Sequence, residues 1–517
     1  MPRTRRLARG QEITYSTAKE QEVNILHQLT YYDQQHQFFA LLSDKREWMK
    51  TVVARHLGLQ SAAHCRVADT DEWLHGSFNV CIPIVVGEWA GKRVLIRFPL
   101  PYRVGEAFHP GNGDEKLRCE AATYAWLQDH CPGVSIPQLY GFTLSTGETF
   151  TRLENLPFFP RCYNALRRRL LSWLGYSVPS NYVRCRPINH PDPVSDTGYL
   201  VVEYIDETQG AMLSNTWADG RHNPHLCKNL FRGLSRVLLN MARVPLPKIG
   251  SFIIDNDGFL SLSNRPLSVE IHQLENENIP TGIPRHYTYS TTESYIVDML
   301  SVHDSRFRNQ PNAINDLGDM GCQLAALSAM RTVFPSFFPR EDRRGPFSLM
   351  LTDLHQSNIF VDDKWNVTHL VDLEWACSRP TELLQLPYWL TNKGVDQLDS
   401  AEYNDIREEF MTIFADEEEK LDLATPKIAT IPRLSEMMEQ TWATGTFWYA
   451  LALSSPSGLF TIFNEHIRPL FCEKYGEEFN LILPFLWDKK IGQIAGRKIA
   501  DKEKYDEKLR QAFEDDS

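Results

Sequence analysis

The stretch FSLMLTDLHQSNIFVDDKWNVTHLVDLEW, residues 347–375, decides the fold of this chain. It alternates short apolar runs with clusters of Asp, Asn and Ser. The apolar runs at 348–352, 359–361 and 367–371 predict three strands, because strands are bounded by residues of this kind. Asp362 and Asp363 are turn formers, so the second and third runs are expected to form a hairpin.

Three polar residues stand at the ends of these predicted strands. Asp353 follows the first strand, Asn358 precedes the second, and Asp372 follows the third. A hairpin brings the start of one strand near the end of the other, so Asn358 and Asp372 are expected to lie together, facing the loop that carries Asp353. Carboxylate and amide oxygens suit Mg²⁺, and a further carboxylate can take a hydroxyl proton. Each residue alone is equally typical of a turn or a cap, but their shared order and spacing favour a site.

The spacing D-x-x-x-x-N, followed by an apolar strand that ends in Asp, resembles the catalytic core of the kinase-like phosphotransferases. The runs D-L-H-Q-S-N-I and D-L-E-W are similar to the aminoglycoside phosphotransferase (choline-kinase-like) branch, in a form common in fungi. The resemblance implies that Asp353 is the catalytic base, Asn358 a metal ligand and Asp372 the principal metal ligand. Two positions depart from the family pattern, since Leu351 replaces a supporting His and Thr352 replaces a Gly.

The bulk composition limits the classes of function. The chain has 517 residues, 42% of them hydrophobic and 23% charged, which predicts a soluble globular protein with more than one lobe or domain. Its net charge of −12 argues against sequence-independent nucleic-acid binding. No apolar run approaches the ~18 residues of a membrane span.

The cysteines and the first residues bear on metal binding and localisation. The 10 Cys form no C-x-x-C pair, so zinc is not expected, and scattered Cys fit a reducing compartment. The expected localisation is cytoplasmic. The opening MPRTRRLARG carries Arg but no acid, which leaves a mitochondrial presequence as the alternative to a basic tail.

Domain organisation follows from the spacing of apolar residues. Helical spacing over 21–57 predicts a helical N-terminal extension, residues 1–60. A nucleotide-covering N-lobe is expected over 61–205, and a catalytic, mostly helical C-lobe over 206–517.

A Gly/Ser turn, Gly76-Ser77-Phe78-Asn79, opens the first apolar hairpin of the N-lobe. Such a turn can present backbone N–H groups to phosphates. It is similar to the nucleotide-covering turn of the same family, and this resemblance implies nucleotide contacts for Gly76, Ser77 and Asn79.

Arg97 lies within the apolar run V-L-I-R-F-P, where an unpaired charge would be costly. The resemblance places the phosphate-contacting Lys of the fold at this point, and Arg also binds phosphate well. Glu120, on a helix predicted over 115–130, is the expected ion-pair partner. The alternative is an Arg on a surface strand and a solvated Glu.

The hinge between the lobes is predicted at 202–205, where backbone groups would meet the adenine edge, framed by Glu203 and Ile205. An insertion at about 145–197 precedes it, rich in Arg, Pro and aromatic residues. Its segment 161–174 is basic and amphipathic. We favour a solvated face above packed leucines there, with contact to a partner or a membrane surface as the alternative.

These patterns together predict an α+β, two-lobed protein-kinase-like fold. The expected function is ATP- and Mg²⁺-dependent phosphorylation of a hydroxyl group on a small molecule. The identity of that molecule and the oligomeric state of the protein stay open. The alternative is a pseudokinase-type nucleotide-binding scaffold or regulatory protein. A protein kinase is less favoured because the sequence lacks H-R-D and D-F-G.

Overall fold

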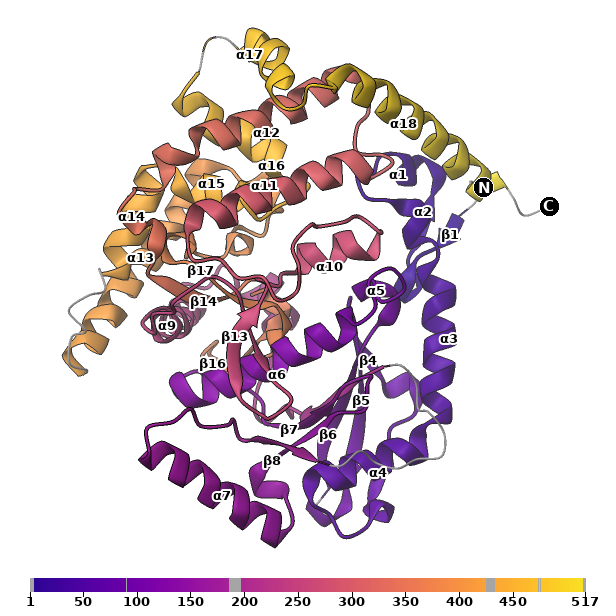
Figure 1. Ribbon diagram of the computed structural model, residues 1–517, viewed down its shortest axis with the longest axis vertical. Helices are drawn as coiled ribbons and strands as arrows, with labels where there is room; N and C mark the ends of the chain where they lie inside the picture. Colours follow the sequence, from indigo (N-terminus) through magenta and orange to yellow (C-terminus); the bar gives the residue numbers. More distant parts are fainter. Residues whose placement is uncertain are drawn as a thin grey trace.

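The computed structural model describes residues 4–89, 91–185, 197–424, 433–472, 474 and 476–514. These residues form two lobes, with the sheet of the N-lobe below and the helical C-lobe above in Figure 1. The N-lobe sheet has eight strands in the order β3-β5-β6-β10-β7-β8-β9, with β4 beside β5. They are β3 (Cys65–Val67), β4 (Leu74–His75), β5 (Asn79–Val86), β6 (Lys92–Pro99), β7 (Leu139–Thr143), β8 (Thr149–Arg152), β9 (Tyr182–Cys185) and β10 (Tyr199–Glu203).

Alternation along β6 decides which residues face which helices. Val94, Ile96 and Phe98 pack with α3 (Tyr31–Asp44) and α4 (Arg46–Leu57) on one face of the sheet. Arg97 points to the other face, because successive side chains of a strand alternate. That face is covered by α6 (Asn112–His130), whose apolar residues share a core with Phe142 and Leu200.

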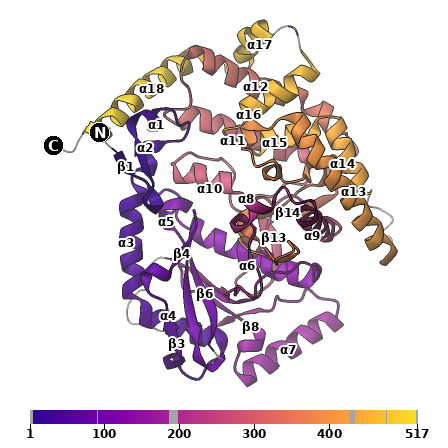
Figure 2. The ribbon, with the colours of Figure 1, turned by 180° about the vertical axis from the view of Figure 1, so that it is seen from behind.

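The two ends of the chain pack together. A hairpin of β1 (Thr4–Arg6) and β2 (Glu12–Thr14) precedes α1 (Tyr15–Lys19) and α2 (Ile25–Gln28). These elements form a small core with α18 (Ile491–Glu514), and they lie beside that helix in both ribbon views (Figures 1 and 2). The predicted N-terminal extension is therefore helical over α1–α4 but begins with a hairpin.

The predicted insertion contains regular structure. Strands β8 and β9 extend the N-lobe sheet at its edge, and α7 (Phe158–Trp173) connects them. The favoured interpretation of the basic patch, packed leucines under a solvated face, is wrong, because Leu170 and Leu174 are exposed. The end of the insertion, 186–196, lies outside the described residues.

The C-lobe is mostly helical and is built around short strands that carry the candidate site. Helix α5 (Pro101–Val104) lies between β6 and α6 and precedes this lobe. The helices of the C-lobe are α8 (Trp217–Gly220), α9 (Pro224–Ala242), α10 (Val269–Asn276), α11 (Thr292–Asn309), α12 (Leu317–Phe337), α13 (Ser400–Ala424), α14 (Leu434–Ala443), α15 (Thr446–Leu453), α16 (Leu459–Ile462) and α17 (Gly476–Ile482), together with α18. Its strands are β11 (Ala211–Met212), β12 (Ser251–Ile254), β13 (Leu260–Asn264), β14 (Phe347–Leu351), β15 (Ile359–Val361), β16 (Val367–Leu370) and β17 (Ala376–Pro380).

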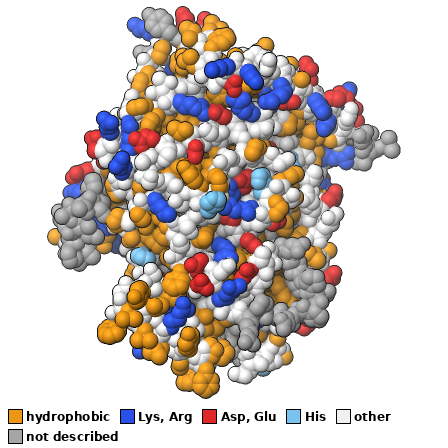
Figure 3. All heavy atoms as spheres, viewed as in Figure 1, with side chains coloured by type: hydrophobic (Ala, Val, Ile, Leu, Met, Phe, Trp, Pro, Cys, Tyr) orange, Lys and Arg blue, Asp and Glu red, His pale blue; other side chains and the backbone are white. Residues whose placement is uncertain are grey.

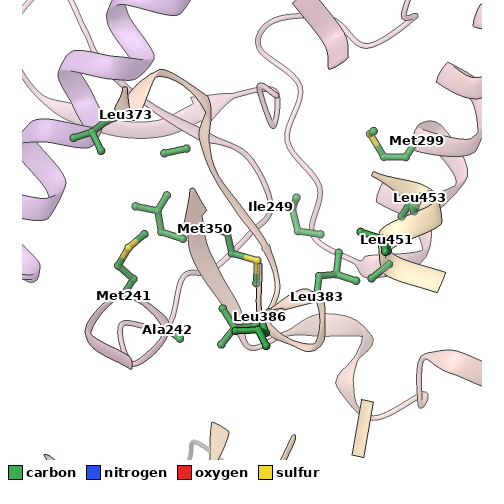
Figure 4. Packing of buried hydrophobic residues seen from close by; sticks show 14 of the residues in the cluster. Met241, Ala242, Ile249, Met299, Met350, Leu373, Leu383, Leu386, Leu451 and Leu453 are labelled. Atoms are coloured by element: carbon green, nitrogen blue, oxygen red, sulfur yellow. The ribbon is translucent and has the colours of Figure 1, made fainter. Parts of the chain in front are cut away.

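Apolar side chains from many of these elements meet in one core. Figure 4 shows Met241 of α9, Met350 of β14 and Leu451 of α15 converging with Leu383 and Leu386. Because β14, β15 and β16 contribute to this core, the loops at their ends are held in place. The two-lobed α+β fold predicted from the sequence is confirmed. No helix among the described residues is both long and apolar enough to cross a bilayer.

Candidate active site

The hairpin predicted within residues 347–375 forms, and it brings the three polar residues together. Strands β15 and β16 pair antiparallel, with Ile359 opposite Leu370. The backbone N–H of Val371 donates to the Asn358 carbonyl at 3.0 Å, which places Asn358 beside the residue before Asp372. The Asn358 Nδ2 donates to the Asp353 carbonyl at 2.8 Å and lies 3.5 Å from Asp353 Oδ2. The catalytic and metal-binding roles of these residues stay predictions.

The backbone of Asp372 is left-handed, with φ of 58°. This conformation is uncommon for a residue other than Gly and is frequently found at functional sites. It turns the chain sharply from β16 into the Leu373–Trp375 turn. The Asp372 carboxylate contacts Arg97 Nη2 through Oδ1 at 2.7 Å, and its side chain is still 41% exposed.

Arg97 and Glu120 form the ion pair that the sequence predicts, with Arg97 Nη1 2.5 Å from Glu120 Oε1. Both are buried, and Arg97 also pairs with Glu374. Arg97 thus contacts carboxylates from α6, from the end of β16 and from the following turn. Its predicted contact with nucleotide phosphates stays a prediction.

Two residues of this network carried no role in the sequence analysis. Lys116 Nζ lies 2.9 Å from Glu374 Oε2 and 2.5 Å from Asn79 Oδ1, and Lys116 and Glu374 are both buried. Lys116 precedes Glu120 by four residues, so both point from the same face of α6. The four-residue spacing of Lys116 and Glu120, and the position of Glu374 two residues after Asp372, are the sequence signals that could have predicted that Lys116 and Glu374 join this network.

The Gly/Ser turn is attached to the segment that carries Asp372 and Glu374. The Gly76 N–H donates to the Asn79 carbonyl at 2.9 Å and closes the turn between β4 and β5. Phe78 packs edge-on against Trp375 with ring centroids 4.6 Å apart. Asn79 is only 7% exposed, and its Nδ2 donates to Glu374 at 2.9 and 3.1 Å. A nucleotide contact by the Asn79 side chain would require it to give up these bonds, while contacts by Gly76 and Ser77 stay predictions.

The predicted hinge follows β10. The Glu203 N–H donates to the Gln138 carbonyl at 2.8 Å, and Glu203 Oε2 accepts from the Gln138 N–H at 3.0 Å. A cavity of about 650 Å³ lies beside this segment, and Glu203 contributes to its lining. Arg93 stacks over the Tyr204 ring in the same cavity, with its guanidinium carbon 3.9 Å from the ring centroid. Ile205, the other residue expected to frame an adenine, is half-buried.

Asp353 lines a second cavity, of about 410 Å³, on the C-lobe side. Burial raises the pKa of Asp353 to about 7, and the negative charges of Glu374, Asp372 and Glu270 add to this effect. A pKa near the working pH suits a general base. The role of Asp353 as the base stays a prediction that this pKa favours.

The lining of that second cavity, which we call the acceptor cavity, presents apolar and polar surface in nearly equal parts, although most of its residues are apolar. It includes Val237, Leu238, Met241, Leu349, Met350, Leu351, Leu354, Leu383, Leu384, Leu386, Tyr388, Trp389 and Leu451. Its charged side chains are Asp353, Glu270 and Arg379. Arg379 is buried, and its Nη1 donates to Ser454 Oγ at 3.4 Å.

The residues available for a metal ion are oxygen donors. No group of three or more His, Cys, Asp or Glu able to hold a metal occurs within the described ranges. Mg²⁺ needs fewer protein ligands, because it is usually bound by one or two carboxylates together with substrate phosphates. Asp372 contacts Arg97 through one carboxylate oxygen and is partly open to solvent. Asp372 and Asn358 therefore fit this ion by their chemistry.

Comparisons with known proteins found no matching family model and no matching curated protein. Solved structures of similar arrangement include the aminoglycoside phosphotransferase APH(4)-Ia, with 11% sequence identity and a TM-score of 0.34 over 77% of this chain and 94% of that one. The macrolide 2′-phosphotransferase MphH from Brachybacterium faecium has 12% identity and a TM-score of 0.33 over 83% and 99% of the two chains. An ethanolamine kinase from Plasmodium vivax has 10% identity and a TM-score of 0.34 over 82% of each chain.

Superpositions this loose carry no argument about the chemistry of this chain. The fold is described by its own topology. A sheet whose Arg97 forms a buried ion pair with Glu120 of α6 is followed, after β10, by a helical lobe that contains the β15–β16 hairpin.

Proposed function

We propose that this protein is an ATP- and Mg²⁺-dependent phosphotransferase that phosphorylates a hydroxyl group of a small molecule, of the aminoglycoside phosphotransferase (choline-kinase-like) type. One observation carries the proposal. Asp353 and Asn358 are hydrogen-bonded at the base of one hairpin, and Asp372 at its end contacts the Arg97 that pairs with Glu120. Turns and caps formed independently would have no reason to meet in this way.

Each residue then has a chemical task. Asp353 orients the acceptor hydroxyl and takes its proton, because it faces the acceptor cavity with a pKa near neutrality. Asn358 and Asp372 would hold the Mg²⁺ ion, which would supply positive charge to offset that of the phosphates. Arg97, held by Glu120, approaches the phosphates from the N-lobe. Catalysis of this kind is mostly positioning and charge stabilisation.

The acceptor cavity supports a particular kind of hydroxyl compound. Its leucines and aromatic rings lie beside the charged side chains of Glu270, Asp353 and Arg379, which suits a molecule with both apolar and polar parts. The proposal therefore concerns the reaction and leaves the identity of the hydroxyl compound open.

A nucleotide-binding scaffold without transferase activity is the second candidate. Arg97 already pairs with three carboxylates, those of Glu120, Asp372 and Glu374, so a phosphate has to compete for it. Leu351, in place of the family's His, adds to this possibility. The two candidates differ in turnover and not in nucleotide binding.

Nucleotide binding is tested by thermal unfolding of the full chain. ATP with Mg²⁺ should raise the melting temperature, because a ligand at 100 times its dissociation constant stabilises the folded state by about 2.7 kcal/mol. Arg97→Lys should retain much of the shift, since Lys can still reach a phosphate, and Arg97→Ala should lose most of it. Arg66→Ala, at an exposed Arg on β3, is the matched control and should behave as wild type. The absence of any shift at millimolar ATP and Mg²⁺ would contradict both candidates.

A further inference from the structure

Helix α7 is attached to the edge of the N-lobe, and none of its 16 residues is buried. It lies at the lower left of Figure 1, and hydrophobic side chains gather over the same part of the molecule in Figure 3. A surface helix normally turns its apolar stripe to the core and its charges to water. Helix α7 does the opposite, because its large apolar side chains face away from the lobe.

The outward stripe of α7 follows helical spacing. Phe159, Tyr163, Leu166, Leu170 and Trp173 are separated by four and three residues in turn, so they line one face. Phe159 is 81% exposed, Leu170 48% and Trp173 82%. A contiguous apolar patch of this kind on a soluble protein marks a surface that binds something.

The inward side of α7 is held by polar groups. Arg168 donates to the carbonyl of Pro179, and Arg161 donates to the carbonyl of Glu154 at 3.4 Å. Arg167 lies over the Phe259 ring with its guanidinium carbon 5.8 Å from the centroid. These contacts fix the helix on the lobe, so rotation of the apolar stripe into the core would break all of them.

The charge of this segment is opposite to that of the whole chain. Residues 155–185 contain Arg161, Arg167, Arg168, Arg169 and Arg184 and neither Asp nor Glu, whereas the chain carries a net charge of −12. Arg169 is exposed at the edge of the apolar stripe, whereas Arg161 is exposed on the side of the helix turned toward the lobe. Basic residues that flank a stripe of Trp, Phe, Tyr and Leu are typical of helices that lie in the interface of an anionic membrane.

We propose that α7 docks this protein on an anionic lipid surface, with the helix parallel to the membrane plane and its stripe in the headgroup region. Trp and Tyr suit this depth because each has an apolar ring and a polar group. A second copy of the chain fits less well, because a symmetric contact through α7 would place its arginines against one another. The inference does not rest on the proposed phosphotransferase activity.

The test is sedimentation of the full chain with vesicles, without nucleotide, so its outcome is separate from that of the ATP experiments. Wild type should bind vesicles of phosphatidylcholine with phosphatidylserine more tightly than phosphatidylcholine alone, and added NaCl should weaken the binding. Phe159→Ser combined with Trp173→Ser should lower the partition coefficient by about tenfold or more, since both rings lose their burial in the interface. Arg169→Glu should weaken binding to anionic vesicles and leave the melting temperature unchanged.

The matched control is Leu481→Ser combined with Phe485→Ser, two other exposed apolar residues, at the end of α17 and in the turn that follows it. These changes should leave vesicle binding as in wild type. Failure of wild type to bind anionic vesicles would overturn the proposal. So would an equal loss in the Leu481/Phe485 control, or a dimer in sedimentation velocity that Phe159→Ser with Trp173→Ser dissociates while vesicles have no effect.

Discussion

Asp353→Asn is expected to lower turnover by roughly 10²–10⁴-fold while ATP and Mg²⁺ binding barely change. The substitution keeps the size and hydrogen-bonding reach of the side chain but removes the base. A loose, dissociative transition state requires less help from a base, so the loss is expected to fall toward the low end of this range. Turnover is compared with that of Asp363→Asn, an exposed turn residue of the same hairpin, which should remain fully active.

The pH dependence of wild type provides the internal control for this substitution. Burial, together with the charges of Glu374, Asp372 and Glu270, raises the pKa of Asp353 to about 7. The group is protonated below that pH and able to accept a proton above it, so kcat/KM should rise with pH through about 7 and then level off. The residual activity of Asp353→Asn should lack this rise. If Asp353→Asn instead loses Mg²⁺ binding while Asp372→Asn keeps it, the roles of base and metal ligand are reversed.

Glu374→Ala is expected to destabilise the protein by about 3–5 kcal/mol, the usual effect of removing one partner of a buried ion pair. Lys116 is fully buried and would keep Asn79 as its hydrogen-bond partner but lose the carboxylate 2.9 Å away. Arg97 would keep Glu120 and Asp372. The measurement is the shift of the urea unfolding transition relative to wild type.

Two further variants decide whether the charge network causes this loss. Lys116→Met combined with Glu374→Ala should cost less than the sum of the two single changes, because it removes the uncompensated charge. Glu419→Ala, at an exposed position of α13, should change stability by about 0.5 kcal/mol or less. Additive losses at Lys116 and Glu374 would show that the two residues do not stabilise each other.

The parts of the fold that were predictable from sequence are those with a local pattern. The hairpin of β15 and β16 follows from apolar runs bounded by turn residues, and its observed strands differ from the predicted ones by a single residue. The Arg97–Glu120 pair follows from the cost of burying a lone charge in an apolar strand. Both arguments need only a few neighbouring residues.

The parts that were not predictable depend on tertiary contacts. Strand β17 exists because it pairs with β14, so its own short sequence carries little signal. Glu374 acquires its partners from α6 and β5, elements more than 200 residues away in sequence. For α7, periodicity predicts an apolar stripe but not the side of the helix that meets the lobe, and this is why the favoured interpretation failed.

The most direct test of the central claim is transfer of the labelled γ-phosphate of ATP to compounds in a metabolite extract, with wild type and Asp353→Asn compared in the presence and absence of Mg²⁺. The account predicts a labelled phosphate ester with wild type and Mg²⁺, and roughly 10²–10⁴-fold less with Asp353→Asn. It also predicts no product when Mg²⁺ is removed, because Asp372 and Asn358 then have no ion to hold between the phosphates. A chain that binds ATP and Mg²⁺ but yields no labelled product with any hydroxyl compound, or yields as much with Asp353→Asn, would contradict it.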